Sequence, residues 1–271
     1  MTPYAFIGML GAAGRLKRQK MRKAETKTIK GAKPVALVTG SNAGIGRAIA
    51  LALGQEGYDV LVNYRRRKQS AEATARRICA SGGRAHAIQA DVSQSDDVQQ
   101  LFDLIAHKFG RLDVLVNNVG EYVRKDFARL TSKDVRRLTE SNYFSVVECS
   151  LRAAKLMRKS KFGRIINIGY VYAERLQANP RVAAYHCAKQ AMISFSLSLA
   201  KNLARHRITV NIISPGININ SIEKPRLLAT QVPFGRLGRY TDITNAVLFL
   251  LKPESEYITG THFKVSGGHG L

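Results

Sequence analysis

The sequence predicts an α/β protein in which helices cover both faces of a doubly wound, seven-stranded parallel sheet. Three observations lead to this class. From residue 34 onward, apolar segments of strand length alternate with longer helix-forming segments, which is typical of parallel βαβ units. A glycine-rich turn joins the first strand to the first helix, as expected for a sheet of this kind. With 271 residues, 45% of them hydrophobic, the chain can bury one large core, so we expect a single domain.

The first half of the sheet is predicted from three strand-and-helix pairs. The first strand, at residues 35–39, is an apolar run that leads into the glycine turn and a helix at 44–56. Two more pairs repeat the pattern: a strand at 58–63 with a helix at 68–80, and a strand at 84–89 with a helix at 95–109. This alternation predicts that successive strands run parallel.

The second half continues the same alternation with longer connections. The expected elements are a strand at 112–116, a long helix within 131–159, a strand at 164–168, a helix at about 183–205, a strand at 208–213, an irregular stretch to about residue 239, a helix at 241–251 and a last strand at 261–265. In sheets of this kind, ligands bind at the carboxyl ends of the strands.

The N-terminal segment, residues 1–33, differs from the rest of the chain. It lacks a sustained hydrophobic period and ends in a glycine- and proline-containing stretch, so we expect a partly disordered basic extension before a domain at 34–271. Nine Lys or Arg and one Glu give residues 1–34 a charge of +8, so the remainder carries +16 of the total +24. Such a field attracts polyanions, but it also describes an ordinary solvated surface.

Composition argues against several classes of protein. Cys79, Cys149 and Cys187 are odd in number and far apart, which predicts neither a disulfide framework nor a metal site. The longest apolar stretch is too short to span a bilayer, and the basic cluster follows it, which is the reverse of the order in a secretory signal. We therefore expect a cytoplasmic protein without a membrane span or a metal.

The turn after the first strand is the first candidate site. Gly40, Gly44 and Gly46 stand where missing side chains let backbone amides approach a diphosphate, and the following helix favours its negative charge. The intervening Ser41, Asn42 and Ile45 belong to the same candidate site. The alternative is a tight turn that binds nothing. Its position between a buried strand and an amphipathic helix favours a dinucleotide site.

The second strand ends at Tyr64, Arg65 and Arg66, where an NAD site would usually carry a carboxylate for the adenosine ribose. Arginines there can pair with a 2′-phosphate instead, so the sequence predicts NADP(H). The alternative is that these residues only begin an exposed basic helix. Other candidates on the adenosine side follow the third and fourth strands: Asp91, Val92, Asn118, Val119 and Gly120.

Tyr185 and Lys189 stand four residues apart in a helix-forming run, which places a phenol and an ammonium on one face. A free tyrosine has a pKa of about 10. A neighbouring ammonium favours the phenolate, so we expect Lys189 to bring the pKa of Tyr185 toward neutrality. A phenol beside a cation can donate a proton, and a dinucleotide next to it can supply a hydride.

These motifs together resemble the short-chain dehydrogenase/reductase family over residues 34–268. The resemblance includes Asn142, Pro215 and Gly216 besides the residues above. It implies one Rossmann-fold domain with strand order 3-2-1-4-5-6-7, and a homotetramer or homodimer. It also implies that Tyr185 is the general acid, that Lys189 bonds the nicotinamide ribose, that Asn142 holds a water in a proton relay, and that Pro215 and Gly216 line the cofactor site. The alternative for Asn142 is a helix-interior amide that is satisfied locally.

One member of the family's catalytic set is missing. The family places a serine two residues after the fifth strand to hydrogen-bond the substrate carbonyl, yet no serine or threonine lies between Lys161 and Ala184. Alignment on the strand puts Tyr170 there, whereas counting back from Tyr185 gives Tyr172. Loss of one such donor typically costs about 10²–10³ in rate. We expect Tyr170 to be a substitute donor or part of the pocket wall; the alternative is a filler in a pocket with little activity.

The function predicted on this basis is NADPH-dependent reduction of a carbonyl to an alcohol. The overall pattern is most similar to 3-oxoacyl-[acyl-carrier-protein] reductases, which implies a small or carrier-bound acyl substrate, and basic residues near the site could dock an acidic carrier. One alternative is reduction of a pteridine-like ring that stacks on Tyr170. Another is a weakly active or non-catalytic NADP-binding protein whose basic extension binds anions. No nucleic-acid module is recognised, so nucleic-acid binding is not expected.

Overall fold

A computed structural model describes residues 33–219 and 229–271. The domain contains a seven-stranded parallel sheet in the order β3-β2-β1-β4-β5-β6-β7, which confirms the predicted fold class and strand order. The predicted extension, apart from Lys33, lies outside the described residues, as does the 220–228 part of the predicted irregular stretch.

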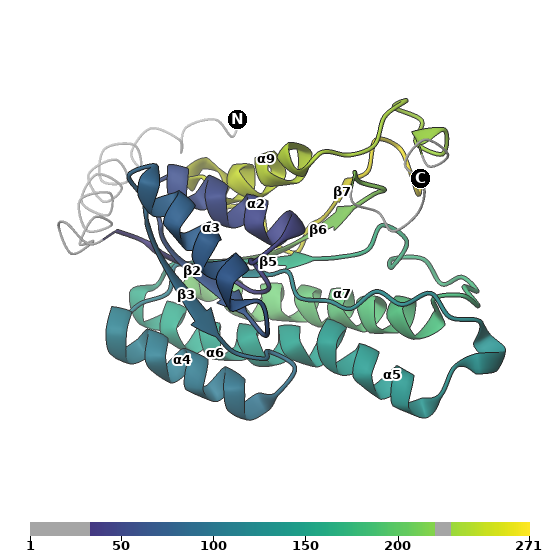
Figure 1. Cartoon of the computed structure of the whole chain (residues 1–271), viewed down its shortest axis with the longest axis horizontal. Coiled ribbons are helices and arrows are strands. Elements are labelled where there is room, and N and C mark those ends of the chain that lie inside the picture. Colours follow the sequence, from purple (N-terminus) through teal and green to yellow (C-terminus); the bar gives the residue numbers. More distant parts are fainter. Residues whose placement is uncertain (1–32, 220–228) are drawn as a thin grey trace, which may run out of the picture. The chain divides into compact units, whose positions relative to one another are not determined.

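The first half of the chain supplies the β3 edge of the sheet (Figure 1). Its elements are β1 Val35–Val38, α2 Gly44–Gln55, β2 Asp59–Tyr64, α3 Lys68–Ala80, β3 Arg84–Gln89 and α4 Ser95–Phe109. The predicted bounds agree with these within two residues. The alternation of apolar strands with amphipathic helices therefore located each element.

The second half supplies the β7 edge. Its elements are β4 Val114–Asn117, η1 Phe127–Arg129, α5 Ser132–Thr139, η2 Glu140–Phe144, α6 Ser145–Ser160, β5 Gly163–Ile168, α7 Ala183–Leu203, η3 Ala204–His206, β6 Ile208–Pro215, α9 Tyr240–Leu251, η4 Pro253–Ser255 and β7 His262–Val265. The single long helix expected within 131–159 is divided into α5 and α6 by the π-helical turn η2. Such turns widen a helix locally and are frequent at functional sites.

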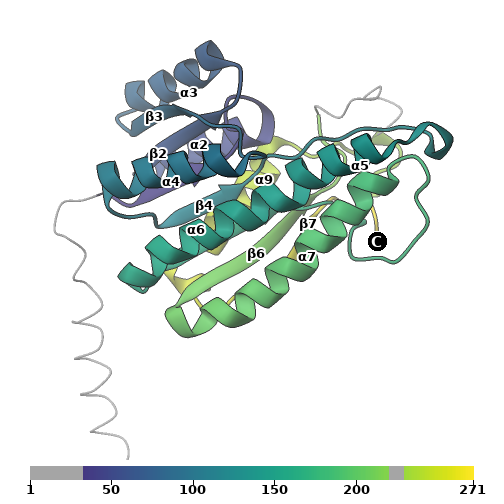
Figure 2. The same cartoon turned by 90° about the horizontal axis from the view of Figure 1, so that it is seen from below.

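The helices form a layer on each face of the sheet. Figure 1 shows α2, α3 and α9 on one side, and Figure 2, seen from below, shows α4, α6 and α7 across the other. Side chains alternate between the two layers along each strand. Leu37 belongs to the cluster beneath α4 and α6, whereas Ala36 and Val38 belong to the cluster beneath α2 and α9.

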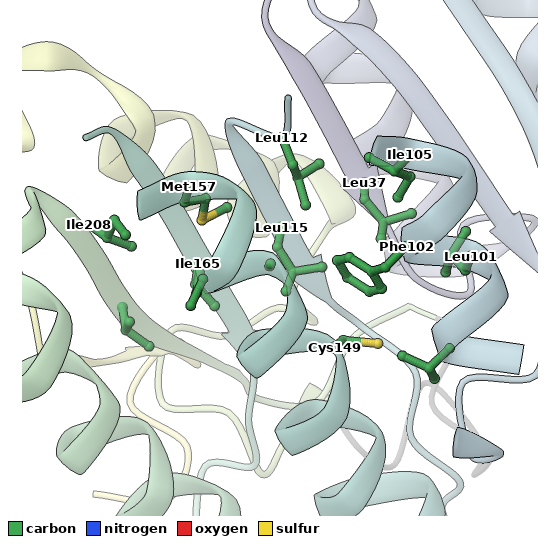
Figure 3. Close-up of a cluster of buried hydrophobic side chains, with 14 of the residues drawn as sticks. Leu37, Leu101, Phe102, Ile105, Leu112, Leu115, Cys149, Met157, Ile165 and Ile208 are labelled. Carbon is green, nitrogen blue, oxygen red and sulfur yellow. The ribbon is translucent and has the colours of Figure 1, made fainter. Parts of the chain in front are cut away.

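The core beneath α4 and α6 is closely packed around the central strands (Figure 3). Leu37 and Leu115 from the sheet meet Phe102 and Ile105 from α4 and Met157 from α6. None of these five side chains is more than 5% exposed. Truncation of such a residue to alanine typically costs about 2–5 kcal/mol, so this core contributes strongly to the stability of the sheet.

The described part of the domain contains neither a membrane-spanning helix nor a cluster of metal-ligating side chains. No helix in residues 33–219 or 229–271 is long and apolar enough to cross a bilayer. Within the same residues, no three His, Cys, Asp or Glu side chains converge in a way that could hold a metal ion.

Candidate active site

The glycine turn between β1 and α2 leaves room for a ligand to approach the backbone. Gly40 and Gly44 adopt φ values of 60° and 58°, a region that L side chains rarely adopt. A Cβ on Gly46 would lie 2.5 Å from the Asn118 amide nitrogen and 2.7 Å from Gly40 O. No side-chain cap is seen at the start of α2 in the described chain, so the helix dipole and its amides face this turn. The turn therefore fits a pyrophosphate.

The end of β4 holds the turn in place. Asn118 donates its side-chain amide to Thr39 O at 3.0 Å and to Gly40 O at 3.2 Å. Thr39 Oγ1 accepts from the backbone amides of Asn118 and Val119 at 2.9 and 3.1 Å. A Cβ on Gly40 would lie 2.9 Å from the Val119 side chain. The predicted residues of the two segments are thus brought into direct contact.

Two other residues of the turn serve to fix its shape. Ser41 is buried and donates its hydroxyl to Val38 O at 2.7 Å. Asn42 O accepts from the guanidinium of Arg47 at 2.6 Å and from Ser70 Oγ at 2.6 Å. The backbone amides of Gly40 and Ser41 are also engaged, since they donate to Asn63 Oδ1 at 3.1 Å and to Asn63 O at 3.0 Å. The amides at the start of α2 are therefore the natural anion ligands.

The adenosine side shows two different environments. Tyr64 and Val92 are buried, with 5% and 3% of their surfaces exposed, and belong to the two core clusters. Arg65 and Arg66 are exposed, and Arg65 Nη1 lies 3.4 Å from Asp91 Oδ2. Burial acts to raise the pKa of the Asp91 carboxyl, whereas hydrogen bonds from Ser93 and the charge of Arg65 act to lower it. The lowering is the larger effect, so the pKa of Asp91 lies below its ordinary value. The predicted arginines therefore stand at the end of β2 with solvent-facing guanidiniums.

A cavity of about 1010 Å³ opens where β4, β5 and β6 end. It brings together eight of the predicted residues, from five different segments: Ile45, Asn118, Gly120, Tyr170, Tyr185, Lys189, Pro215 and Gly216. Tyr64, Arg65, Arg66 and Asp91 lie outside its lining, as expected for the far end of an extended dinucleotide. The position agrees with the rule that ligands bind at the carboxyl ends of parallel strands.

Tyr185 and Lys189 both lie inside this cavity wall on α7. They are 9% and 3% exposed. Lys189 Nζ donates to Ile168 O at 2.7 Å and lies 5.9 Å from the centre of the Tyr185 ring. Burial lowers the pKa of Lys189 to about 8. The shared helix face predicted from the sequence is thus present.

The pKa of Tyr185 differs from the expectation. Burial raises it above its ordinary value, and the phenols of Tyr170 and Tyr122 raise it further. The sequence predicted that Lys189 would lower the pKa of Tyr185, but the pKa of Tyr185 is raised. The Lys189 ammonium donates to Ile168 O rather than to the phenol. Tyr185 is therefore a protonated phenol at neutral pH in the protein alone.

Asn142 lies at the centre of η2 and is fully buried. Its amide nitrogen donates to Glu121 O at 2.9 Å and to Leu138 O at 3.0 Å. Its Oδ1 has no hydrogen-bond partner within the described residues. A Cβ on Gly120 would lie 2.5 Å from that oxygen and 3.3 Å from Lys189 Nζ. The orphaned acceptor and the ammonium therefore both lie close to Gly120, where any larger residue would collide with the Asn142 oxygen.

Tyr170 occupies the position after β5 and lines the cavity. Its ring meets the Tyr185 ring edge-on, with centroids 5.1 Å apart, and the Tyr122 ring also meets the Tyr185 ring edge-on, with centroids 5.0 Å apart. Burial raises the pKa of Tyr170 to about 12. Its phenol therefore keeps its proton at neutral pH and can donate one hydrogen bond.

Sequence reasoning missed two further residues of the wall, Tyr122 and His269, and named a third, Tyr172, only as an alternative. Tyr122, Tyr172 and His269 line the same cavity, and Tyr172 Oη lies 3.0 Å from His269 Nε2. Tyr172 was considered only as an alternative for the missing serine. Tyr122 follows a predicted cofactor residue, Gly120, so proximity in sequence was a usable signal. His269 comes from the C-terminal turn, and no local pattern marks it.

The loop after Tyr170 is fastened to the sheet by a chain of polar contacts. Glu174 accepts from His262 Nδ1 at 3.0 Å and is paired with Lys264, both on β7. His262 Nε2 lies 2.5 Å from the hydroxyl oxygen of Ser214, a buried residue on β6. With Nδ1 donating to the carboxylate, the neutral ring can accept from that hydroxyl. These contacts fix one end of the loop that carries the tyrosines.

A second anchor fixes the next residue of the loop to α7. Arg175 O accepts from Gln190 Nε2 at 2.8 Å and lies 3.1 Å from His186 Nε2. Because α7 also carries Tyr185, the loop and the phenol are held by the same helix.

Comparison with known proteins gives a consistent picture. The family described as enoyl-(acyl carrier protein) reductase matches residues 40–269. The chain is 38% identical over 239 residues to 3-oxoacyl-[acyl-carrier-protein] reductase FabG of Staphylococcus aureus, covering 86% of this chain and 96% of that protein. It is 40% identical over 242 residues to the 3-oxoacyl-[acyl-carrier-protein] reductase of Synechocystis, with the same coverage.

A solved structure shows the same fold. The angucycline C-6 ketoreductase LanV with bound NADP superposes with a TM-score of 0.80 at 32% identity, covering 88% of this chain and 96% of that one. The family match, the two reductases and this structure all extend over the glycine turn, the cavity and α7. The chain therefore belongs to the short-chain dehydrogenase/reductase family of nicotinamide-dependent oxidoreductases.

Proposed function

We propose that the protein reduces the carbonyl of a 3-oxoacyl thioester to an alcohol with NADPH. The observation that carries this proposal is that Tyr185 and Lys189 line one cavity at the strand ends, while the orphaned Asn142 oxygen lies behind the wall, close to Gly120 and to Lys189. The identity to two 3-oxoacyl-[acyl-carrier-protein] reductases supports the substrate class. A cytoplasmic location and a homotetramer or homodimer stay predictions.

The cofactor would lie across the strand ends, where the chain offers a matching set of groups. The amides at Gly44 and Gly46 would hold the pyrophosphate, and Arg65 would pair with the 2′-phosphate of NADPH. Arg65 is 56% exposed at its side chain and lies beside Asp91, so it can turn toward a phosphate at little cost. When bound, the nicotinamide supplies the hydride to the carbonyl carbon.

Tyr185 would donate its phenolic proton to the carbonyl oxygen as negative charge develops there. The phenol is protonated at neutral pH in the protein alone, so it holds a proton that it can give, but its raised pKa would have to fall during the reaction for efficient transfer. Lys189, whose pKa is about 8, would then favour the resulting phenolate by its charge. A water held by Asn142 Oδ1 would return a proton through Lys189. The Asn142 oxygen and the Lys189 ammonium both lie close to Gly120, which would keep that path short.

Tyr170 would take over the role of the missing serine. Its phenol is protonated at neutral pH, and its ring lies beside that of Tyr185 in the same wall. A donor at this position would orient the carbonyl oxygen toward Tyr185 and stabilise its developing charge. A phenol is longer than a serine hydroxyl, so the carbonyl would lie farther from β5.

The test is NADPH oxidation by the wild-type protein with 3-oxoacyl thioesters, diketones and dihydropterins. We expect turnover with the thioesters and a loss of at least about 10²-fold in kcat for Tyr185→Phe. NADPH binding, measured by its fluorescence, should persist in that variant because phenylalanine keeps the ring packing. Undiminished turnover by Tyr185→Phe would overturn the role of the phenol. Binding without turnover of any compound would favour a non-catalytic NADP-binding protein.

A second candidate substrate class is a flat ring, such as a pteridine. Tyr122, Tyr170 and Tyr172 give the cavity an aromatic wall around Tyr185, and LanV is named as an angucycline C-6 ketoreductase. Tyr170→Ser distinguishes the two classes. The serine would supply the family's usual donor, so thioester reduction should be kept or rise, whereas ring reduction should fall because the stacking surface is lost.

An acidic carrier is a proposed partner for the thioester. The domain beyond residue 34 carries a charge of +16, which would speed encounter with an acidic protein. The rate of reduction of a carrier-bound substrate should then fall with rising salt more steeply than that of a free thioester. Equal salt dependence of the two rates would count against a carrier.

A further inference from the structure

A second hollow of about 500 Å³ adjoins the mouth of the catalytic cavity. It is lined by Arg124, Lys125, Asp126, Arg129 and Arg181. Arg124 and Arg181 also line the catalytic cavity, so the two spaces share a wall. Four cationic side chains and one carboxylate therefore stand at the edge of the space where the substrate would enter.

The hollow is built where two loops meet. The backbone amide of Lys125 donates to Arg181 O at 2.8 Å, which ties the segment after β4 to the loop that carries Tyr170. The next residues form η1, closed by Arg129 N donating to Asp126 O at 2.9 Å. This pairing brings Arg181 into the same lining as Arg129, although they are far apart in sequence.

The charged side chains of the hollow differ in their contacts and exposure. Lys125 Nζ donates to Asp134 Oδ2 at 2.5 Å, and this ion pair fixes it to the start of α5. Arg129 and Arg181 are exposed. A planar guanidinium can bind a carboxylate or phosphate through two parallel hydrogen bonds. The arginines of the lining therefore supply the kind of donor that suits an oxyanion.

The geometry points to an anion-binding subsite, which takes a phosphate or carboxylate of the substrate while its carbonyl lies at Tyr185. This inference rests on the proposed function and adds a substrate property to it: an anionic group remote from the reacting carbon. Such a group has two sources, the phosphate of a 4′-phosphopantetheine arm or a carboxylate at the far end of the acyl chain. The subsite contributes binding rather than chemistry, so it should act on the specificity for anionic substrates.

The experiment compares one 3-oxoacyl group in three forms. The neutral reference substrate is the N-acetylcysteamine thioester. The substrate with a phosphate is the 4′-phosphopantetheine thioester. The substrate with a carboxylate is the N-acetylcysteamine thioester whose acyl chain ends in a carboxylate. The measured quantity is the ratio of kcat/KM between each anionic form and the neutral one. We expect the wild-type protein to prefer at least one anionic form, and Arg181→Ala to reduce that ratio by about 3- to 10-fold.

Arg175→Ala is the matched control. Arg175 is an exposed arginine of the same loop, and its side chain lies outside the lining of both hollows. It removes the same charge from the same region, so it measures the effect of the general basic field. Equal reductions by the two variants would overturn the subsite, as would a wild-type protein with no preference for either anionic form. The anionic substrate whose kcat/KM ratio falls in Arg181→Ala identifies the source of the anion.

A binding measurement separates this inference from the proposed function. Inorganic phosphate is titrated by calorimetry into protein saturated with NADP⁺, so that the cofactor's own phosphate sites are filled. Wild-type protein should bind phosphate more tightly than Arg181→Ala, whereas Arg175→Ala should match the wild type. If phosphate binding depends on Arg181 while no thioester is reduced, the subsite stands and the proposed function falls. If thioesters are reduced but Arg181→Ala binds phosphate as tightly as the wild type, the subsite is refuted and the proposed function stands.

Discussion

Lys189 carries an ammonium inside the protein, and its replacement by methionine should make the cofactor-free protein more stable. Burial lowers the pKa of Lys189 from 10.5 to about 8. This difference corresponds to about 3 kcal/mol at neutral pH, because folding removes the charged form from water. Methionine keeps most of the packing but gives up the hydrogen bond to Ile168 O, which is worth about 1 kcal/mol. The expected net gain in the free energy of unfolding is about 2 kcal/mol.

The sign of this effect depends on pH. The pKa of Lys189 is lower in the folded protein than in the unfolded chain, so the unfolded chain binds more protons between about pH 8 and pH 10.5. Wild-type stability therefore rises across that window as the penalty on the ammonium disappears. The advantage of Lys189→Met should be complete below about pH 8 and should be lost as the pH approaches 10.5.

The assay is urea or thermal unfolding of the cofactor-free proteins, followed by circular dichroism at pH 7 and pH 10. A gain of 2 kcal/mol corresponds to a rise of about 4–8 °C in Tm for a domain of this size. Lys201→Met is the control, because Lys201 is an exposed residue of the same helix and its loss removes the same charge. The reasoning would be refuted if Lys189→Met were less stable than the wild type at pH 7, or if its advantage were equal at pH 10.

Three further predictions concern the cofactor turn and the substrate loop. Gly46→Ala should weaken NADPH binding, followed by nucleotide fluorescence, by at least about 10-fold because its Cβ would lie 2.5 Å from the Asn118 side chain; unchanged affinity would contradict the close fit. Arg65→Ser should raise KM for NADPH by about 10-fold and leave KM for NADH unchanged, whereas equal changes would remove Arg65 from the 2′-phosphate site. Glu174→Gln should loosen the loop that its carboxylate fastens to His262, seen as faster hydrogen exchange in residues 170–181. Unchanged exchange would show that the second anchor, at Arg175 O, is sufficient.

The sheet could be predicted because its signals are local. Apolar runs at strand length and the glycine turn at Gly40 each determine a nearby element, and the order of the strands followed from the resemblance and is confirmed by their pairing. The shared helix face of Tyr185 and Lys189 was predictable for the same reason, since it depends only on a four-residue spacing. The sequence also showed that the usual serine is absent, and the structure puts Tyr170 in the cavity wall.

What escaped prediction depends on contacts between distant segments. The π-helical turn arises around Asn142, whose amide donates to Glu121 O, a residue from another loop. His269 reaches the wall through its contact with Tyr172, 97 positions away in the chain. The raised pKa of Tyr185 depends on burial and on two phenols that only the fold brings together. Helical periodicity and residue spacing carry no information about such contacts.

The burial of Lys189 connects stability to cofactor binding. A ligand that binds only the folded state stabilises it by about 2.7 kcal/mol at 100 times its dissociation constant, which exceeds the net loss of about 2 kcal/mol assigned to the buried ammonium. If Lys189 bonds the nicotinamide ribose, as the family resemblance implies, the bound cofactor would offset part of the cost of burying the Lys189 ammonium. That offset would contribute to the free energy of cofactor binding. Saturating NADPH should then raise the Tm of Lys189→Met by less than it raises that of the wild type. Equal rises in both proteins would mean that Lys189 contributes nothing to cofactor binding and that its burial serves the proton transfer alone.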